Sequence, residues 1–194
     1  GTDSRGINGI AYILRGTSYG DVRILTGDSG APDLMDIYGV GDVRGAANMV
    51  GTAQGYPTML GKYPSMNGED NVTLFRVEEM HLIAAETSLR AGNAADALSY
   101  LNNIPAIRGL GADYYASATL ENILEERRKE FAFEGLRFHD LSRMGMDMPS
   151  VDPFKHTNDD LTGTPPAYGS YRYAYPIARS ERNANPNMVQ NYGY

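Results

Sequence analysis

The sequence predicts a mainly α-helical fold: a tetratricopeptide-like helix pair and one long helix, together with extensive loops and a few short strands. Apolar residues recur at helical spacing between about residues 75 and 143. Residues 1 to about 70 instead hold most of the glycines and only short apolar runs, a pattern that is typical of loops. We therefore expect a loop-rich region at residues 1–70 and a helical region at residues 71–194.

Two short helices are expected at residues 75–91 and 94–104. Small and apolar positions recur at helical spacing in the first of them: Val77, Met80, Ile83, Ala84 and Thr87. Gly92 supplies a stop signal, Asn93 caps the second helix, and Pro105 is expected to end it. Such a pair resembles one tetratricopeptide hairpin, which cannot bury both of its faces alone.

The longest helix is expected from Leu120, capped by Thr119, to about Arg143. Charged residues follow one another along it at steps of three, four, three and three: Arg127, Glu130, Glu134, Arg137 and Asp140. Opposite charges at this spacing can pair, and buried charges are tolerated only when paired. We interpret the set as a structural ion-pair ladder. Gly135 inside this helix predicts that another backbone packs closely there.

Composition excludes several classes of function. Seventeen Lys and Arg against twenty-four Asp and Glu give a net charge of −7, the wrong sign for binding nucleic acid. The absence of Cys excludes disulfides, thiolate nucleophiles and Cys-based metal sites. No apolar run approaches the roughly 20 residues that a membrane-spanning helix needs.

Three motifs follow one another in the second half of the chain. Residues 125–141 contain Glu-Arg-x-x-Glu followed by Glu-Gly-x-Arg-x-x-Asp-Leu. Upstream, residues 74–86 read Leu-Phe-Arg-Val-Glu-Glu-Met-His-Leu-Ile-Ala-Ala-Glu. Downstream, Tyr-Pro-Ile-Ala at 175–178 precedes Asn-Pro-Asn-Met-Val-Gln-Asn-Tyr-Gly-Tyr at 185–194. In this order the motifs resemble those of the SusD/RagB-like family, with Ala178 and Tyr192 standing where that family tends to have Pro.

The resemblance implies a non-catalytic lipoprotein of the outer membrane, exposed at the cell surface. It implies binding of a nutrient, typically an oligosaccharide or polysaccharide, for uptake by a SusC-like TonB-dependent transporter. No cofactor is implied. Membrane contact is expected only through an N-terminal lipid anchor that this chain lacks, because the chain corresponds to the C-terminal part of such proteins.

A glycan site needs aromatic rings that stack on sugar faces, and without Trp this role falls to Tyr. The loop-rich region holds the residues that we favour for it: Tyr12, Tyr19, Tyr38 and Tyr56. A second group lies in a Pro/Gly-rich segment before the terminal motif, at Tyr168, Tyr171, Tyr173 and Tyr175.

Two alternative functions stay open at the level of sequence. A glycoside hydrolase would use paired carboxylates such as Glu130 and Glu134, although neighbouring arginines would lower the pKa of a general acid. A tetratricopeptide-type scaffold for protein partners would explain the helix pair but not the terminal motif.

The protease-like loop around Ser29 lacks an upstream His, so we predict no catalytic residues. We also predict no metal site, either at Glu78 and His81 or at His156.

Overall fold

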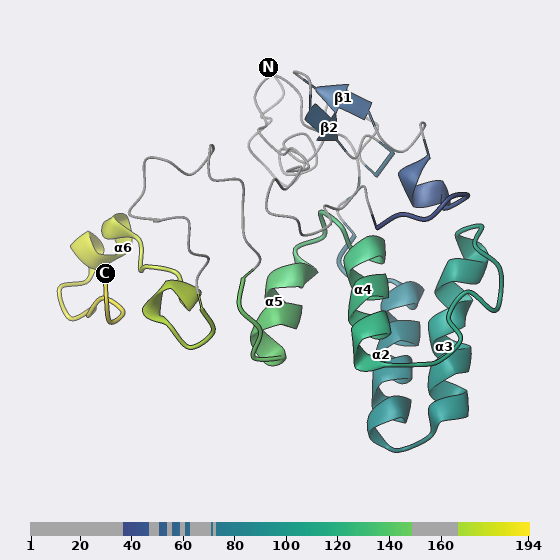
Figure 1. Ribbon diagram of the computed structural model, residues 1–194. Helices are drawn as coiled ribbons and strands as arrows, with labels where there is room; N and C mark the ends of the chain where they lie inside the picture. Colours follow the sequence, from purple (N-terminus) through teal and green to yellow (C-terminus); the bar gives the residue numbers. More distant parts are fainter. Residues whose placement is uncertain are drawn as a thin grey trace. The chain divides into compact units, whose positions relative to one another are not determined.

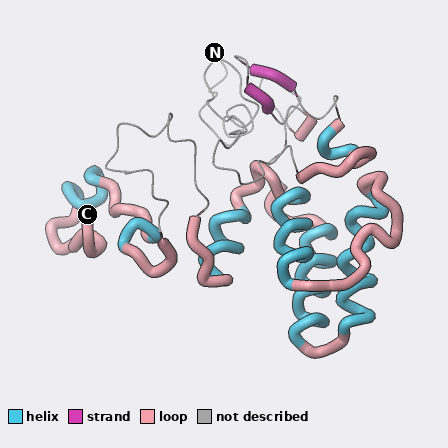
Figure 2. Tube along the Cα trace, viewed as in Figure 1, coloured by secondary structure: helices cyan, strands magenta, loops and turns pink. Residues whose placement is uncertain are grey.

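The computed structural model describes residues 37–46, 51–53, 56–58, 61–62, 71, 73–148 and 167–194. The chain divides into two compact units, Gly1–Arg137 and Phe138–Tyr194. The elements in chain order are η1 (Val43–Gly45), β1 (Gly51–Ala53), β2 (Tyr56–Thr58), α2 (Val77–Arg90), α3 (Ala94–Ile107), α4 (Leu120–Glu130), α5 (Leu136–Arg143), η2 (Tyr171–Tyr173) and α6 (Arg179–Ala184) (Figures 1 and 2). The expectation of a mainly α fold is confirmed. None of the described helices is long and apolar enough to cross a bilayer.

The short strands β1 and β2 form one antiparallel pair, in which Gly51 lies opposite Thr58 and Ala53 opposite Tyr56. The few short strands expected in the loop-rich region are therefore present. Because most of residues 1–70 lie outside the described residues, the proposed boundary at residue 70 stays an expectation.

The helix pair forms as predicted, and α2 and α3 lie side by side with α4 against both (Figure 1). Gly92 takes φ +82°, a conformation that a residue with a side chain rarely adopts. The backbone N–H of Asn93 donates to Ser88 O and that of Gly92 to Leu89 O, so α2 ends in a Schellman motif. The stop signal assigned to Gly92 is confirmed.

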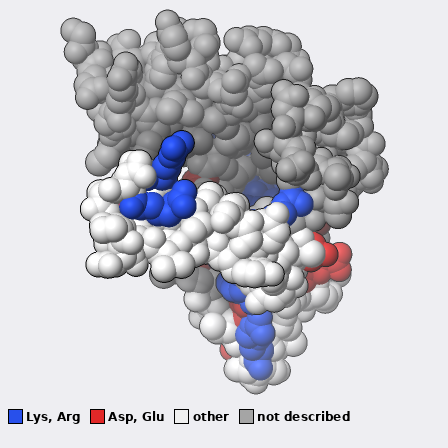
Figure 3. Space-filling model, turned by 90° about the vertical axis from the view of Figure 1, so that its left-hand side faces the viewer, with Lys and Arg blue, Asp and Glu red and all other residues white. Residues whose placement is uncertain are grey.

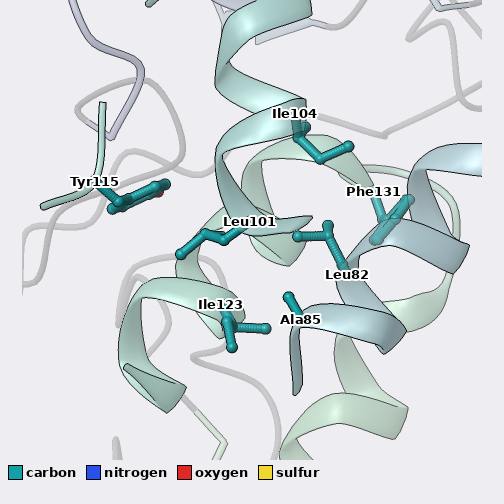
Figure 4. Close-up of a cluster of buried hydrophobic side chains, with 7 residues drawn as sticks. All are labelled: Leu82, Ala85, Leu101, Ile104, Tyr115, Ile123 and Phe131. Atoms are coloured by element: carbon teal, nitrogen blue, oxygen red, sulfur yellow. The ribbon is translucent and has the colours of Figure 1, made fainter. Parts of the chain in front are cut away.

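The hydrophobic core of this unit lies between the three helices (Figure 4). Its buried members come from α2, α3, α4 and the segments beside α4: Leu82, Ala85, Leu101, Ile104, Tyr115, Ile123 and Phe131. Burying each large aliphatic side chain contributes about 1.5 to 3 kcal/mol.

The sequence-based assignment of the stripe on α2 needs correction. The helix buries Leu82, Ala85 and Glu86, whereas Val77, Met80 and Ile83 of the expected stripe are exposed. The helix carries two apolar stripes, and periodicity does not tell which of them meets α3 and α4.

Pro105 does not end α3, which continues to Ile107. A proline in the last turn costs the helix a single hydrogen bond, and Pro105 is itself buried. The Pro105 carbonyl still accepts bonds from the N–H groups of Arg108 and Leu110.

The expected long helix is two helices. Helix α4 begins at the predicted cap, where the Thr119 hydroxyl accepts from the Asn122 N–H at 3.1 Å, but it ends at Glu130. Residues 131–135 form a turn in which Phe133 has φ 64° and Gly135 has φ 81°. No atom of a described residue lies within 4 Å of a Cβ built on Gly135, and the positive φ explains the glycine through the conformation of the turn.

Leu101→Ala should lower the free energy of unfolding by about 2 to 5 kcal/mol, because the side chain is fully buried between the helices. Urea denaturation followed by circular dichroism measures the change. Leu74→Ala is the matched control, since Leu74 is 78% exposed, and should stay within about 0.5 kcal/mol of the parent. Equal effects for both substitutions would contradict the core described above.

Candidate functional site

Glu130 at the end of α4 is the centre of a buried ionic cluster. Its side chain is only 2% exposed. The carboxylate accepts hydrogen bonds from Arg44 Nη1 at 3.0 Å, from Arg108 Nε at 3.0 Å and Nη2 at 2.6 Å, and from Arg76 Nη1. Three arginines from three separate parts of the chain therefore converge on one carboxylate.

One turn earlier on α4, Glu126 extends the cluster. It accepts from Arg44 Nη1 at 2.7 Å and from the Tyr115 hydroxyl at 2.9 Å, and its side chain has no exposed surface. Arg44 also binds Asp42 through two parallel bonds, from Nε at 2.9 Å and Nη2 at 2.7 Å. Asp42 additionally caps η1 by accepting from the Arg44 N–H. The short segment around η1 is thereby attached to α4.

Glu134, in the turn after α4, forms the other end of the cluster. It accepts from Lys62 Nζ at 2.6 Å and from Arg76 Nε at 3.0 Å. Lys62 also donates to the carbonyls of Glu130 and Ala132 at 2.7 and 2.8 Å, which uses all three of its N–H groups on the backbone and side chains of this turn.

The cluster shifts the ionisation of its members. Burial alone would raise the pKa of Glu130, but hydrogen bonds and charges of Arg108 and Arg76 outweigh burial and lower the pKa from 4.5 to about 2. Burial, followed by the charge of Glu126, raises the pKa of Tyr115. Burial lowers the pKa of Lys62 although Glu134 acts in the opposite direction. Glu130 therefore remains a carboxylate at neutral pH and cannot serve there as a proton donor.

Both carboxylates of the predicted ion-pair ladder have partners outside α4, because Glu130 and Glu134 pair with arginines and a lysine from other segments. The turn after Glu130 takes Glu134 off the helix face that the spacing assumed. The ladder as a whole stays a prediction. Arg127 pairs with Glu79 of α2 at 3.8 Å and lies over the ring of Phe131.

Asp140 belongs to the second compact unit. It is buried and pairs within α5 with Arg143 at 2.9 Å. Its membership of a ladder with Glu130 and Glu134 stays a prediction.

Sequence reasoning missed Asp42, Arg44, Lys62 and Arg108 as members of the cluster. Arg44 and Glu130 are 86 positions apart, and Lys62 and Glu134 are 72 apart. Helical spacing describes partners three or four positions apart, so it carries no signal for these pairs. An Arg beside an Asp in a Gly-rich stretch also looks like an ordinary surface loop.

The tyrosines expected to bind ligand are described unevenly. Tyr12 and Tyr19 lie outside the described residues, and Tyr56 is described only as the first residue of β2. Tyr38 is half-buried: its hydroxyl donates to Lys129 O at 3.0 Å, and the Arg44 guanidinium lies 5.8 Å from its ring centre. These contacts fix the orientation of the Tyr38 ring beside the ionic cluster.

The second compact unit is rich in exposed aromatic rings. Tyr168, Tyr171 and Tyr175 are 53, 44 and 77% exposed. Tyr173 stacks on Phe138 with ring centres 5.5 Å apart, and Tyr171 meets Tyr194 edge-on at 5.3 Å. Figure 3 shows one face of the molecule, on which the described surface is mainly uncharged, with some Lys and Arg side chains in blue and some Asp and Glu side chains in red.

The terminal motif folds back on the segment that precedes α6. The Gln190 side chain accepts from the Ile177 N–H at 2.8 Å and donates to the Ile177 carbonyl at 3.2 Å. Asn191 Nδ2 donates to Tyr175 O at 2.7 Å, and the Tyr194 hydroxyl donates to Ala174 O at 2.7 Å. The terminal motif therefore supplies hydrogen-bond partners to the Tyr-Pro-Ile-Ala motif at 175–178.

A cavity of about 310 Å³ opens beside the ionic cluster within the first unit. Four basic side chains line it, those of Arg44, Lys62, Arg76 and Arg108, together with the carboxylates of Glu130 and Glu134. Asn71 and Thr73 add uncharged polar groups. A second cavity of similar volume is lined by Tyr38 and the loop that follows it, and Val43 borders both cavities.

Metal-ligating groups do not gather within the described ranges, where no three His, Asp or Glu side chains are placed to hold a metal ion. Of the motifs weighed for a metal, His81 contacts Asn103 through its ring at 3.3 Å. His156 and Ser29 lie outside the described residues.

Glu130→Gln should destabilise the protein by about 3 to 5 kcal/mol, because it leaves three buried or half-buried guanidinium groups without their shared counter-charge. Urea denaturation at neutral pH measures the loss. Glu121→Gln is the control, since Glu121 is exposed in the first turn of the same helix, and should change stability by a few tenths of a kcal/mol. A Glu130→Gln protein as stable as the parent would contradict the central place of Glu130.

The same carboxylate predicts a specific pH dependence. Its pKa in the folded protein, about 2, lies below the ordinary value of 4.5. Its contribution is therefore complete above pH 4.5 and is lost as the pH falls toward 2, on the order of 3 kcal/mol in all. Unfolding free energies measured across this window should fall more steeply for the parent than for Glu130→Gln. Parallel pH profiles would exclude Glu130 as the source.

The chain is similar to known proteins in its sequence and in its fold. A family model described as the SusD family matches residues 48–194. The chain is 32% identical over 142 residues to the starch-binding protein SusD of Bacteroides thetaiotaomicron, a match that covers 73% of this chain and 24% of that protein. It is 27% identical over 149 residues to the SusD-like protein P25 of Formosa agariphila, a match that covers 68% of this chain and 26% of that protein.

Among solved structures, a SusD superfamily protein from Bacteroides vulgatus superposes with a TM-score of 0.59 at 30% identity, covering 80% of this chain and 36% of that one. The chain spans about a quarter of the length of the curated relatives it matches. The family match includes α4 with Glu126 and Glu130, the helix pair and the terminal motif, but not Asp42 and Arg44 of the cluster. The chain belongs to the SusD family.

Proposed function

We propose that this chain is part of a non-catalytic protein that binds an oligosaccharide or polysaccharide at the cell surface. The observation that carries the proposal is the family match over residues 48–194, supported by a relative named for starch binding. The proposal includes attachment to the outer membrane as a lipoprotein and delivery of the nutrient to a SusC-like TonB-dependent transporter.

The state of the carboxylates supports a binding role over hydrolysis. A glycosidase needs one carboxyl group that is protonated near neutral pH. Glu130 has the opposite property, since its pKa is lowered to about 2, and Glu134 is held by Lys62 and Arg76. Glu130 is therefore not available as a general acid, and Glu134 is held in ion pairs. A protein-interaction scaffold would account for α2 and α3 but gives no role to the terminal motif.

The ligand contacts that we propose remain Tyr12, Tyr19, Tyr38 and Tyr56. Tyr38 supports this choice in part, because its ring lines a cavity next to the ionic cluster. Loops positioned by a rigid scaffold commonly carry binding residues, and the bonds of Asp42, Arg44 and Lys62 hold this region on α4.

The purified chain should bind at least one oligosaccharide of a polysaccharide-derived panel and should release no reducing sugar from any of them. Isothermal titration calorimetry measures the first property and a reducing-sugar assay the second. Turnover that disappeared in Glu134→Gln would overturn the non-catalytic assignment. Absence of binding to every glycan, by a folded chain, would overturn carbohydrate binding as the function of this part of the protein.

Binding should be weak and should depend on tyrosines of the loop-rich region. One stacked ring contributes about 0.5 to 1.5 kcal/mol beyond area burial, so one or two of them give roughly millimolar affinity. Titrations followed by NMR should show weaker binding in Tyr12→Ala, Tyr19→Ala and Tyr38→Ala, with Tyr171→Ala as the control from the other unit. Loss of binding only in Tyr171→Ala would instead place the ligand on the C-terminal tyrosines.

A further inference from the structure

Two polar side chains at the cavity beside the ionic cluster make no hydrogen bond with the described part of the chain. They are those of Asn71 and Thr73, which line the cavity. Both residues are exposed. A ligand can therefore bind their amide and hydroxyl groups without breaking a hydrogen bond to any described residue.

Two of the three arginines that line this cavity also have N–H donors that the cluster does not use. A guanidinium has five N–H groups. Arg76 uses Nε, one N–H of Nη1 and one of Nη2, all on Glu130 and Glu134. Arg108 uses Nε and Nη2 on Glu130 and Glu78, and its Nη1 makes no hydrogen bond with a described residue. Their side chains are 19 and 23% exposed, so both groups reach solvent.

The charge of the cluster limits which ligand fits. The four basic side chains at the cavity are matched by five carboxylates within the same bonds: Asp42, Glu78, Glu126, Glu130 and Glu134. Among the described residues at the cavity, no positive charge remains to neutralise an acidic ligand. The free donors and acceptors suit instead an uncharged molecule with many hydroxyl groups, which binds through paired hydrogen bonds.

We propose that this cavity is a subsite for one neutral sugar residue, held by hydrogen bonds from Asn71, Thr73, Arg76 and Arg108. Its volume of about 310 Å³ lies at the lower end of small-molecule sites, which suits a single residue. No aromatic ring is among the described residues that line it, so the sugar is held by its hydroxyls and not by stacking. The proposal rests on the carbohydrate-binding function and deepens it.

The neighbouring cavity can hold a second sugar residue of the same glycan. Val43 borders both cavities, and the ring of Tyr38 lines the second. When one sugar residue of a glycan contacts Tyr38, the adjoining sugar residue can therefore reach the polar cavity. In this arrangement Tyr38 contributes contact area and the polar cavity selects the pattern of hydroxyl groups.

The test uses the whole chain and titrates it with maltohexaose, cellohexaose and mannohexaose, followed by amide chemical shifts in two-dimensional NMR. The neutral oligosaccharide that binds should shift the amides of residues 71 and 73. The double substitution Asn71→Ala with Thr73→Ala should weaken binding at least about tenfold, the loss that about 1.4 kcal/mol of hydrogen bonding produces. Asn103→Ala, an exposed Asn on α3, is the matched control and should bind like the parent.

A second arm tests the charge argument. Glucose, galactose and mannose are compared with the hexuronate of the same configuration, and each uronate should bind more weakly than its neutral counterpart. Tighter uronate binding would overturn the neutral-sugar assignment. Undiminished binding by the double variant would overturn the subsite while leaving carbohydrate binding intact. Failure of the parent chain to bind any neutral saccharide would overturn the proposed function together with this subsite.

Discussion

The arrangement of the first unit depends on one buried carboxylate, that of Glu130. Removing a carboxylate from water costs several kcal/mol, and the cost is offset only when hydrogen bonds satisfy its oxygens. Arg44, Arg76 and Arg108 supply those bonds. Arg44 lies in η1, Arg76 directly precedes α2, and Arg108 directly follows α3. The carboxylate therefore fixes three segments relative to α4.

The apolar core alone does not specify this arrangement. Leu82, Leu101 and Ile123 hold the three helices together through non-directional contacts. The segment around Asp42 and Arg44 contributes no side chain to that core, and Lys62 likewise reaches the helices only through polar bonds. Directional hydrogen bonds therefore attach the loop-rich part of the chain to the helical part, and they position Tyr38 and the polar cavity beside α4.

The sequence predicted what depends on local signals. Gly92 ended α2 in a Schellman motif, Thr119 capped α4, and helical spacing located three of the helices. The break after Glu130 was missed because the apolar period continues through Phe131 and Phe138, while the turn is set by the left-handed backbone of Phe133 and Gly135. The partners of Glu130 were missed because they lie 22 to 86 positions away, where no periodicity applies.

The same buried cluster that stabilises the scaffold also determines what the adjoining cavity can recognise. The described carboxylates of the cluster beside the cavity each pair with an arginine or a lysine. The arginines, with more N–H groups than the carboxylates consume, keep donors for a partner outside the cluster. A network with no excess of positive charge but with spare N–H donors is suited to hydroxyl-rich ligands, because these accept hydrogen bonds without adding a charge that the network would have to neutralise.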